Sequence, residues 1–400
     1  MKKVRFCILG AGPSGLAFAA TLARAKCDSF VVLEKEAVAG GLCRSAMVDG
    51  SPLDIGGGHF LDLRRTKVLD FLFRYMPRAE WAEFDRVATI RIRSSEVEHP
   101  LEGNLWQLPV ADQIDFLESI AVAPCNRGEP EPATFAEWIR WKLGSRIADE
   151  YMVPYNQKLW SIPLTDLASD WIHKLPSVSF RQTLESCLVR KAGGALPAHG
   201  RFLYPRAHGY GEVWTRIAAS LGDRFIPNYT LRSIDVDQRM VNDDFQADVL
   251  VSTIPWHTWK TIAPLPAAVT AAVDGLVHTS VDIDYHGDNL PSRAHWIYEP
   301  DENLRHHRLL LRHNFCAGSR GHWTEANAKR SGAATGPRFH NPYAYPVSTV
   351  GKEARLATIL DWASAHAIVG LGRWGTWEHI NSDVAVEQAM ASAERYLGSP

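Results

Sequence analysis

The sequence predicts an α/β fold in which a sheet of parallel strands carries a glycine-rich turn, a helical region is inserted in the middle, and a second sheet is antiparallel. Three observations indicate this arrangement. A strand, a glycine turn and a helix open the chain, residues 112–188 have mostly helical apolar spacing, and short alternating segments flank that region. The 400 residues, 46% hydrophobic and 22% charged, have the composition of a globular protein, which excludes disordered and collagen-like chains.

Charge and cysteine usage exclude several classes of function. The 43 Lys+Arg and 45 Asp+Glu give a formal net charge of -2, so no overall basic field exists to hold nucleic acid or an anionic membrane. The six cysteines are scattered without a C-x-x-C pair, which argues against disulfides and structural zinc and favours the reducing cytoplasm. We expect no membrane span, because no stretch reaches about 18 uncharged apolar residues. We expect no metal, and the pairs His306-His307 and His313/His322 are interpreted as polar surface residues.

The start of the chain has the pattern of a dinucleotide site. Residues 4–9 predict a buried parallel strand, a turn with Gly10, Gly12 and Gly15 follows at once, and residues 16–25 predict an apolar helix. The first glycine permits the tight turn, the second lets a pyrophosphate approach the backbone, and the third lets the helix pack on the strand. The helix N-terminus offers free N–H groups to the phosphates. A glycine turn without a ligand is the alternative.

A second strand over residues 30–33 ends at Glu34, an acid placed to bind ribose hydroxyls. The run Gly40-Gly41-Leu42-Cys43-Arg44-Ser45 follows and resembles the G-G-x-x-R-S segment of FAD oxidoreductases of the amine oxidase and protoporphyrinogen oxidase type. The expected dinucleotide is therefore FAD. In these two segments we expect it to contact Gly10, Gly12, Ser14, Gly15, Glu34, Lys35, Gly41, Leu42 and Arg44.

Two more glycine segments are expected to complete the cofactor site. Residues 54–59 place three consecutive glycines after a short strand, where backbone approaches a flat ring closely, although a plain turn is the alternative. Near the C-terminus, a strand over residues 367–370, a glycine turn and a helix over residues 383–397 return the chain to the first domain. The expected contacts are Gly57, Gly58, Gly372, Arg373, Asp383 and Val384.

The rest of the chain is expected to form two other domains. Residues 88–93, 280–285, 295–298 and 308–313 predict antiparallel strands, and residues 248–254 predict another parallel strand. Residues 316–340, rich in Gly, Ala, Ser and Arg, are interpreted as a mobile loop. The expected boundaries are 1–85, 190–265 and 345–400 for a discontinuous Rossmann-like FAD-binding domain, 105–188 for an inserted helical substrate domain, and 86–104 and 270–344 for an antiparallel sheet domain.

The most specific motifs lie in the helical region. Thr134-Phe-Ala-Glu-Trp138 and Tyr155-Asn156-Gln-Lys158-Leu-Trp160-Ser-Ile-Pro163 look like an F-x-E-W and a P-Y-N-x-K-x-W-x-x-P signature. Further matches are Leu203-Tyr-Pro205-Arg206 with Gly209 and Gly211, Trp296-Ile-Tyr298 to Arg308, and Gly372-Arg373-Trp-Gly375 to Asp383. Together these segments cover most of the chain and resemble the UDP-galactopyranose mutase family, flavoenzymes that interconvert the pyranose and furanose forms of a nucleotide sugar.

The resemblance implies roles for particular side chains. Tyr155 is similar to the aromatic residue that stacks on uracil and Trp160 to the one that lines the sugar pocket, with core packing as the alternative. Arg308 matches one of two arginines that grip the diphosphate, and the other falls on Lys174. The remaining implied substrate contacts are Asn156, Tyr298, Tyr345, His379 and Asn381. His59 and Arg373 are the catalytic candidates, and Gly209 belongs to a glycine loop beside the flavin.

Three departures from the family pattern bear on the substrate. One extra glycine precedes His59, so this histidine is expected to be displaced. Lys174 neutralises a diphosphate only as a point charge, which predicts a looser grip with Arg305 in compensation, although solvated surface charge is the alternative for both. His379 and Asn381 stand where bacterial members have a tyrosine and an acid, and this predicts altered sugar recognition unless both are plain loop residues.

The reaction that the resemblance implies has no net redox change. N5 of the reduced flavin attacks the anomeric carbon and displaces UDP, the sugar recloses through another hydroxyl, and UDP returns. The flavin needs an electron donor, either NAD(P)H or a reductase. Neither a nucleic-acid nor a membrane partner is expected, and the sugar, the base and the oligomeric state stay open. Two alternatives remain, an FAD-dependent oxidoreductase of an amine or secondary metabolite, and a binding protein that keeps the flavin site as a relic.

Overall fold

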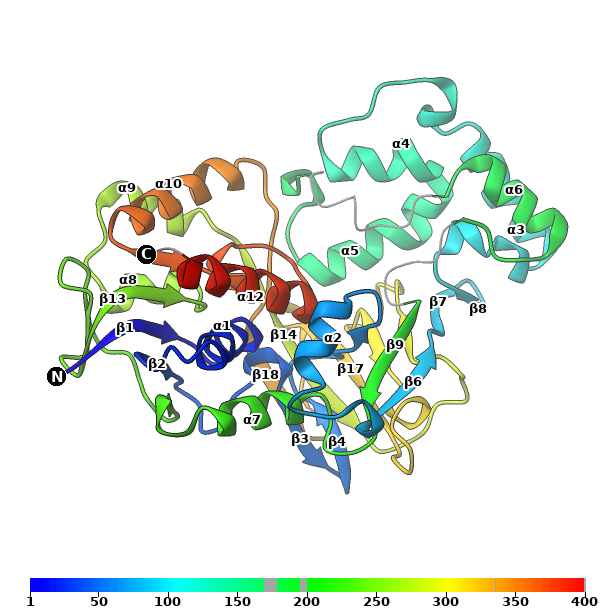
Figure 1. The fold of residues 1–400 in the computed structure, drawn as a ribbon. Coiled ribbons are helices and arrows are strands. Elements are labelled where there is room, and N and C mark those ends of the chain that lie inside the picture. The colour runs from blue at the N-terminus through cyan, green and yellow to red at the C-terminus, as the bar shows by residue number, and fades with distance from the viewer. Residues whose placement is uncertain (169–177, 195–199, 335, 399–400) are drawn as a thin grey trace.

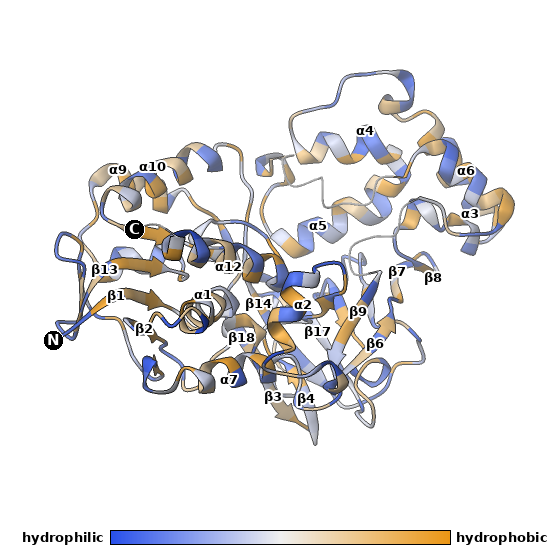
Figure 2. Cartoon of the chain, in the orientation of Figure 1, coloured by the Kyte–Doolittle hydropathy of each residue, from blue (hydrophilic) through white to orange (hydrophobic). Residues whose placement is uncertain are grey.

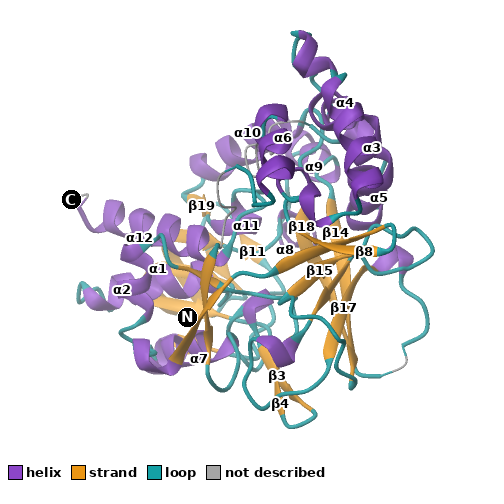
Figure 3. Cartoon of the chain, turned by 90° about the vertical axis from the view of Figure 1, so that its right-hand side faces the viewer, coloured by secondary structure: helices purple, strands orange, loops and turns teal. Residues whose placement is uncertain are grey.

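The computed structural model describes residues 1–168, 178–194, 200–334 and 336–398 and has the predicted α/β architecture (Figure 1). A parallel sheet with helices on both faces lies at the end that holds the N-terminus. An antiparallel sheet lies beside it, and a group of helices stands at the opposite end (Figure 1 and Figure 3). Within the described residues, no helix combines the length and the apolar character that a bilayer crossing requires.

The parallel sheet brings the ends of three strands to one edge. Its order is β10-β2-β1-β13-β12-β11, with β19 paired to β13. β1 pairs in parallel with β2 and β13, so that Leu9 lies opposite both Leu33 and Ser252. The bounds are Lys2–Leu9 (β1), Phe30–Leu33 (β2), Phe225–Ile226 (β10), Ile234–Asp235 (β11), Met240–Val241 (β12), Phe245–Ser252 (β13) and Ile368–Gly370 (β19). The four parallel strands expected from the sequence are β1, β2, β13 and β19.

Helices cover both faces of this sheet, which explains why β1 is apolar from Phe6 to Leu9. Phe6 and Ile8 pack into the core beneath one set of helices, and Cys7 and Leu9 pack into the core on the other face. The first set is α1 (Pro13–Arg24), α7 (Gly211–Ser220) and α12 (Ser382–Gly398); the second is α8 (Trp256–Ile262), α9 (Ala267–Asp274) and α10 (Lys352–Ala365). The two helices expected at the ends of the chain are α1 and α12.

The second sheet runs in the order β18-β14-β17-β16-β15-β7-β8. Adjacent strands of this sheet are antiparallel, as expected, except for β15 and β7, which run parallel. These two strands come from distant parts of the chain. The bounds are Ala88–Ile92 (β7), Ser95–Glu98 (β8), His278–His286 (β14), Trp296–Tyr298 (β15), Arg308–Leu310 (β16), His322–Asn327 (β17) and Arg338–Pro346 (β18). Smaller pieces are Ser45–Val48 (β3) with Ser51–Asp54 (β4), and Leu61–Asp62 (β5), Trp81–Asp85 (β6) and Arg201–Pro205 (β9).

Two expectations for this region are wrong. The segment 316–340 is not a loop throughout, because it contains β17, whose six residues are all buried between β14 and β16. Because the residues of this segment are largely polar, the sequence did not indicate that it contains a central strand. His307 and His322 are likewise buried rather than on the surface, since strands and loops cover them. The strand expected over 308–313 ends at Leu310, and a short 3-10 turn follows.

The helical group consists of α3 (Val110–Ala121), α4 (Phe135–Ile147), a π-helical turn (Ala148–Met152), α5 (Val153–Trp160) and α6 (Phe180–Val189). Two short helices elsewhere are α2 (Thr66–Leu72) and α11 (Gly372–Gly375). The group has its own apolar core, which includes Phe116, Phe135 and Ile139. α5 packs against β17 of the antiparallel sheet. It is therefore the helix that brings side chains to the junction between the helical group and that sheet.

Arg312 is completely buried and holds the β3–β4 hairpin to the antiparallel sheet. Its guanidinium donates to the carbonyl oxygens of Val48 (2.9 Å), Ser51 (3.0 Å) and Arg320 (2.6 Å). We predict that Arg312→Met destabilises the protein by about 3 kcal/mol or more, because several buried carbonyls lose a charged donor. Thermal unfolding measures this. Arg320→Met, at an exposed ion pair with Asp49, is the control and should destabilise the protein much less; equal effects would contradict the prediction.

Candidate functional site

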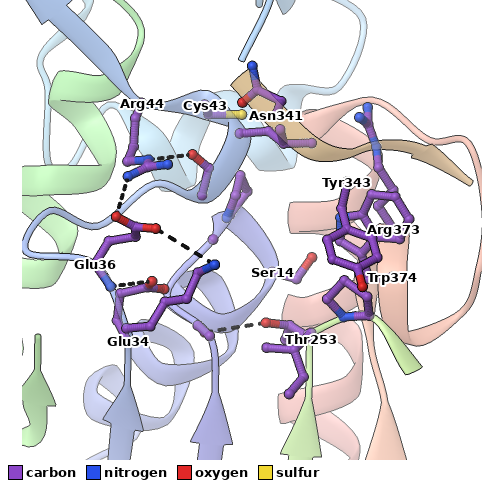
Figure 4. A pocket seen from close by; sticks show the side chains of 18 of the residues that line it. Ser14, Glu34, Glu36, Cys43, Arg44, Thr253, Asn341, Tyr343, Arg373 and Trp374 are labelled. Carbon is purple, nitrogen blue, oxygen red and sulfur yellow. Dashed lines mark hydrogen bonds and ion pairs between the residues drawn. The ribbon is translucent and has the colours of Figure 1, made fainter. Parts of the chain in front are cut away.

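A cavity of about 510 Å³ opens at the carboxyl edge of the parallel sheet (Figure 4). Segments that follow three neighbouring strands line it: Gly10 and Gly12 after β1, Glu34 after β2, and Thr253 after β13. Ligands of open α/β sheets bind at this edge. The strand order of the sheet therefore places the predicted glycine turn and the predicted acid in one cavity.

The glycine turn is built to admit a ligand at its second glycine. A Cβ on Gly10 would lie 2.6 Å from Thr253 Oγ1, and a Cβ on Gly15 would lie 2.1 Å from the carbonyl oxygen of Gly10, so protein fills both places. A Cβ on Gly12 would meet nothing within 4 Å. Gly12 is also the N-cap of α1, with no side chain capping the helix, so the first N–H groups are free for an anion.

Glu34 is buried and presents its carboxylate to the cavity. Its Oε2 accepts from the backbone N–H of Ala11 (2.7 Å) and its Oε1 from that of Glu36 (3.0 Å), which fixes the carboxylate and leaves lone pairs for hydroxyl groups. Lys35 and Arg44 also line the cavity, and both pair with Glu36, at 3.8 and 3.2 Å; Figure 4 shows Arg44 beside Glu36. The predicted residues Ser14, Gly41 and Leu42 also line the cavity.

The other predicted glycines pack against protein rather than line the cavity. A Cβ on Gly57 would lie 2.9 Å from Glu325 Oε1, and one on Gly58 would lie 2.0 Å from Leu310 Cδ2. A Cβ on Gly209 would lie 2.6 Å from Ser45 Oγ, and one on Gly372 would lie 1.9 Å from Ser14 Oγ. The residues at these four positions are thus glycines because chain segments meet there. Asp383, in the first turn of α12 beside Val384, pairs with Arg65 at 3.1 Å.

His59 reaches the cavity despite the extra glycine before it. Its Nδ1 lies 2.7 Å from the carbonyl oxygen of Gly57, and its ring stacks on Tyr210 with centroids 5.9 Å apart. Burial and the charge of Arg373 lower the pKa of His59 to about 3. The ring is therefore neutral, with Nδ1 as donor and Nε2 as a free acceptor.

Arg373 brings a positive charge to the cavity wall without a carboxylate partner among the described residues. Its Nε and Nη2 donate to the carbonyl oxygen of Ile380 (3.1 and 2.7 Å), and its Nη1 donates to that of Ala344 (2.9 Å). Burial lowers the pKa of Arg373. A sheltered cation whose partners are neutral carbonyls provides a place for an anionic ligand.

The predicted substrate residues come together beside this cavity, between α5 and the antiparallel sheet. Tyr155 and Tyr298 meet edge to face with ring centroids 5.5 Å apart, and Arg308 Nη2 donates to the Tyr345 hydroxyl at 3.4 Å. His379 lies 5.8 Å from Trp160 and 4.8 Å from Tyr345, measured between ring centroids. Burial raises the pKa of Tyr155 well above its usual value, so its phenol is neutral.

Two predicted substrate residues have different places. Asn156 is buried, and its amide is used inside α5, where Oδ1 accepts from Trp160 Nε1 (3.0 Å), so it orients the tryptophan. Asn381 lines the dinucleotide cavity rather than the tyrosine cluster. Lys174 lies outside the described residues. Arg305 packs against Gly332.

Glu325, on β17, was not identified from the sequence. It is completely buried, its Oε2 accepts from Arg308 Nε (2.6 Å) and Nη2 (2.5 Å), and its Oε1 accepts from the N–H of Gly58 (3.1 Å). It thereby joins the arginine to the glycine turn that carries His59. Lys158, from the same motif as Tyr155, donates to the carbonyl oxygens of Glu299 and Asp301 (both 2.7 Å) and holds the β15–β16 loop.

Other cavity residues also escaped the sequence analysis. Thr253 had a signal, the turn after a predicted parallel strand. The others come from a loop, from α8 and from β18 without a local motif: Tyr229, Thr230, Leu231, Thr258, His340 and Tyr343.

Residues 8–75 match the family described as NAD(P)-binding Rossmann-like domain. Among solved structures, the chain is similar to a reduced UDP-galactopyranose mutase, with 21% identity, a TM-score of 0.88, and coverage of 100% of this chain and 95% of that one. It is also similar to a protein described as a protoporphyrinogen oxidase from Exiguobacterium sp. 255-15 (14% identity, TM-score 0.71, 99% of each chain) and to a putrescine oxidase (15%, 0.65, 99% of each).

These comparisons establish the fold. The chain contains a Rossmann-like dinucleotide-binding domain, and its whole length takes the fold of the UDP-galactopyranose mutase, as the motifs predicted. The same fold supports oxidases. The reaction must therefore be argued from the site.

Asp54 is completely buried beneath the glycine turn, where its Oδ1 accepts from Ser45 Oγ (2.6 Å) and from the N–H of Tyr210 (3.2 Å). Burial raises the pKa of Asp54 to about 7. The folded state thus holds a proton that the unfolded chain releases near pH 4, and stability is lost as pH rises from about 4 through about 7.

We predict that Asp54→Asn removes most of this pH dependence, which amounts to roughly 3–4 kcal/mol. The measurement is the thermal midpoint at pH 5 and pH 8 for both proteins. The difference between the two midpoints should be smaller in the variant. A variant whose midpoint falls with pH as steeply as that of the wild type would show that Asp54 is ionised in the fold.

Proposed function

We propose that this chain binds FAD in the cavity and, with the flavin reduced, interconverts the pyranose and furanose forms of a nucleotide sugar resembling UDP-galactose. The single observation that carries the proposal is the cluster of Tyr155, Tyr298, Arg308 and Tyr345, joined through Glu325 to the turn that carries His59. The likeness over the whole chain to a reduced UDP-galactopyranose mutase supports it.

The cavity residues fit FAD. The open space at Gly12 and the uncapped start of α1 suit a pyrophosphate, and the fixed carboxylate of Glu34 suits ribose hydroxyls. Arg373 would face the flavin, where its charge favours an anionic reduced form. When bound, reduced FAD supplies the nucleophile for the anomeric carbon. The protein would obtain electrons from NAD(P)H or a reductase and act in the cytoplasm.

The tyrosine cluster suits a nucleotide diphosphate sugar. The guanidinium of Arg308, oriented by Glu325, would bind phosphate oxygens and hold the departing nucleotide diphosphate near the sugar. The hydroxyl groups of Tyr298 and Tyr345 would donate hydrogen bonds to it, and Tyr155 would stack on the base. The neutral His59 would offer Nε2 as a hydrogen-bond acceptor to a sugar hydroxyl.

An oxidoreductase acting on an amine or secondary metabolite is the second candidate. The fold it shares with the oxidases favours it. A neutral or cationic amine, however, would not need a cationic group such as Arg308 at the centre of its binding site.

The decisive experiment uses the FAD-loaded protein, reduced with dithionite. We predict that it converts one member of a panel of UDP-, dTDP- and GDP-sugars into its furanose isomer, detected by chromatography. With cyanoborohydride present, the cofactor released from the protein should gain the mass of one sugar. Failure with every sugar, together with oxidation of an amine by the oxidised protein, would replace the mutase proposal with the oxidase.

For the converted sugar, Arg308→Lys should lower kcat/KM roughly 10- to 100-fold, because a point charge replaces a forked donor. Arg305→Lys is the matched control, since Arg305 packs against Gly332, and it should change kcat/KM less than about twofold. Comparable losses in both variants would remove Arg308 from the site.

We also predict that Arg373→Met lowers the midpoint potential of the bound flavin, because the reduced anion loses a nearby positive charge. Arg373→Lys keeps the charge and should retain more of the wild-type potential. The potentials come from dye-coupled spectroscopic titration, after the flavin absorbance has confirmed that FAD is bound. An unchanged potential in Arg373→Met would mean that Arg373 only positions the loop.

A further inference from the structure

Two ionisable side chains that the proposed function does not use, His99 and Glu102, lie on the turn that leads from β8 to the helical group. The backbone N–H of His99 donates to the carbonyl oxygen of Ala88 (2.8 Å), which continues the pairing of β7 with β8. The side-chain amide of Asn104 donates to the carbonyl oxygen of Pro100 (3.0 Å). The backbone that carries both side chains is therefore fixed.

This turn borders the tyrosines that the proposed function assigns to the nucleotide. The ring centroid of His99 lies 5.1 Å from that of Tyr298. The ring centroid of Tyr151 lies 5.9 Å from that of Tyr155 on α5, a helix that mixes hydrophilic and hydrophobic residues (Figure 2). Burial raises the pKa of Tyr151, and the groups around it, which include the other two tyrosines and Glu102, raise it further. The carboxyl group of Glu102 therefore lies near the same three rings.

His99 is held as a neutral hydrogen-bond donor. Nη2 of Arg86, which can only donate, lies 2.8 Å from Nδ1 of His99, so Nδ1 is the acceptor. Burial and the charge of Arg86 lower the pKa of His99 well below its usual value. The neutral ring must then carry its proton on Nε2. Such an N–H suits an oxo group of a nucleobase, which guanine, uracil and cytosine possess and adenine lacks.

Glu102 is a buried acceptor without a protein partner. Its side chain is only 7% exposed, and in the described part of the chain no N–H or O–H group of another residue donates to its carboxylate. Burial raises the pKa of Glu102 to about 7, against the smaller lowering effects of its own backbone N–H and of Lys142. A polar group so buried is normally hydrogen-bonded. Its two oxygens suit a ligand that presents two neighbouring N–H donors.

We propose that Glu102 and His99 recognise the base of the nucleotide sugar and that this base is guanine. Guanine presents two neighbouring donors, N1–H and the N2 amino group, beside the oxo group O6. The donors match the two oxygens of Glu102, and O6 matches Nε2–H of His99. Uracil would turn an oxo group toward a carboxylate oxygen, and cytosine and adenine would turn a ring nitrogen lone pair toward it. This inference rests on the proposed function, which leaves the base open, and it makes the substrate a GDP-sugar.

Binding of nucleoside diphosphates to the FAD-loaded protein tests this without any turnover, because FAD already occupies the dinucleotide cavity. In isothermal titration calorimetry, GDP should bind roughly 10-fold or more tightly than UDP, CDP or ADP, since a mismatched base leaves a buried carboxylate oxygen unpaired. Glu102→Gln should reverse the order of GDP and UDP, because an amide presents one acceptor and one donor, which match N3–H and an oxo group of uracil. A gain of affinity for UDP cannot arise from a loss of folded structure.

Glu118→Gln is the matched control, because it makes the same substitution at an exposed glutamate of α3, and it should keep the wild-type order. His99→Phe keeps an aromatic ring but removes the donor, so it should weaken the binding of GDP without favouring UDP. A wild type that prefers UDP, or a folded Glu102→Gln variant that still prefers GDP, would overturn the assignment of guanine and leave the proposed function standing. A protein that binds none of the four nucleotides would overturn both. Preference for GDP without conversion of any GDP-sugar would overturn the proposed function alone.

Discussion

The carboxylate of Glu325 is the constraint on which the candidate site depends. A completely buried carboxylate is tolerated only when charge and hydrogen bonds compensate it, and here Arg308 supplies the charge while the N–H of Gly58 supplies a third donor. The arginine comes from β16, the glycine from the loop after β4 and the glutamate from β17. One side chain therefore fixes the distance between the parallel-sheet cavity and the tyrosine cluster, and the absence of side chains at Gly57 and Gly58 permits that approach.

This pairing also determines the charge of the site. Because Glu325 balances Arg308, the cation left without a carboxylate among the described contacts of the cavity wall is Arg373. Burial keeps His59 neutral and the phenols of Tyr155 and Tyr345 protonated, so these three side chains act as hydrogen-bonding groups. The arrangement suits two anions held side by side, a cofactor near Arg373 and a diphosphate near Arg308.

The parts of this architecture that local sequence determines were predictable. β1, the glycine turn and Glu34 follow from apolar runs and from the needs of a phosphate near backbone. Glu325 and His307 were not predictable, because β17 and its flank are buried by neighbours that are distant in sequence, and their polar residues look like loop residues. Gly57 and Gly58 were identified from a run of glycines, whereas the close approach of Glu325 and Leu310 to these two glycines could not be inferred from a single sequence.

The helical region shows the same limit of prediction from a single sequence. Periodicity identified its helices, yet it did not indicate that α6 would bury Thr183 and Ser186 and leave Leu184 and Leu188 exposed. A period reports that one face is apolar, and only tertiary contacts report what that face meets.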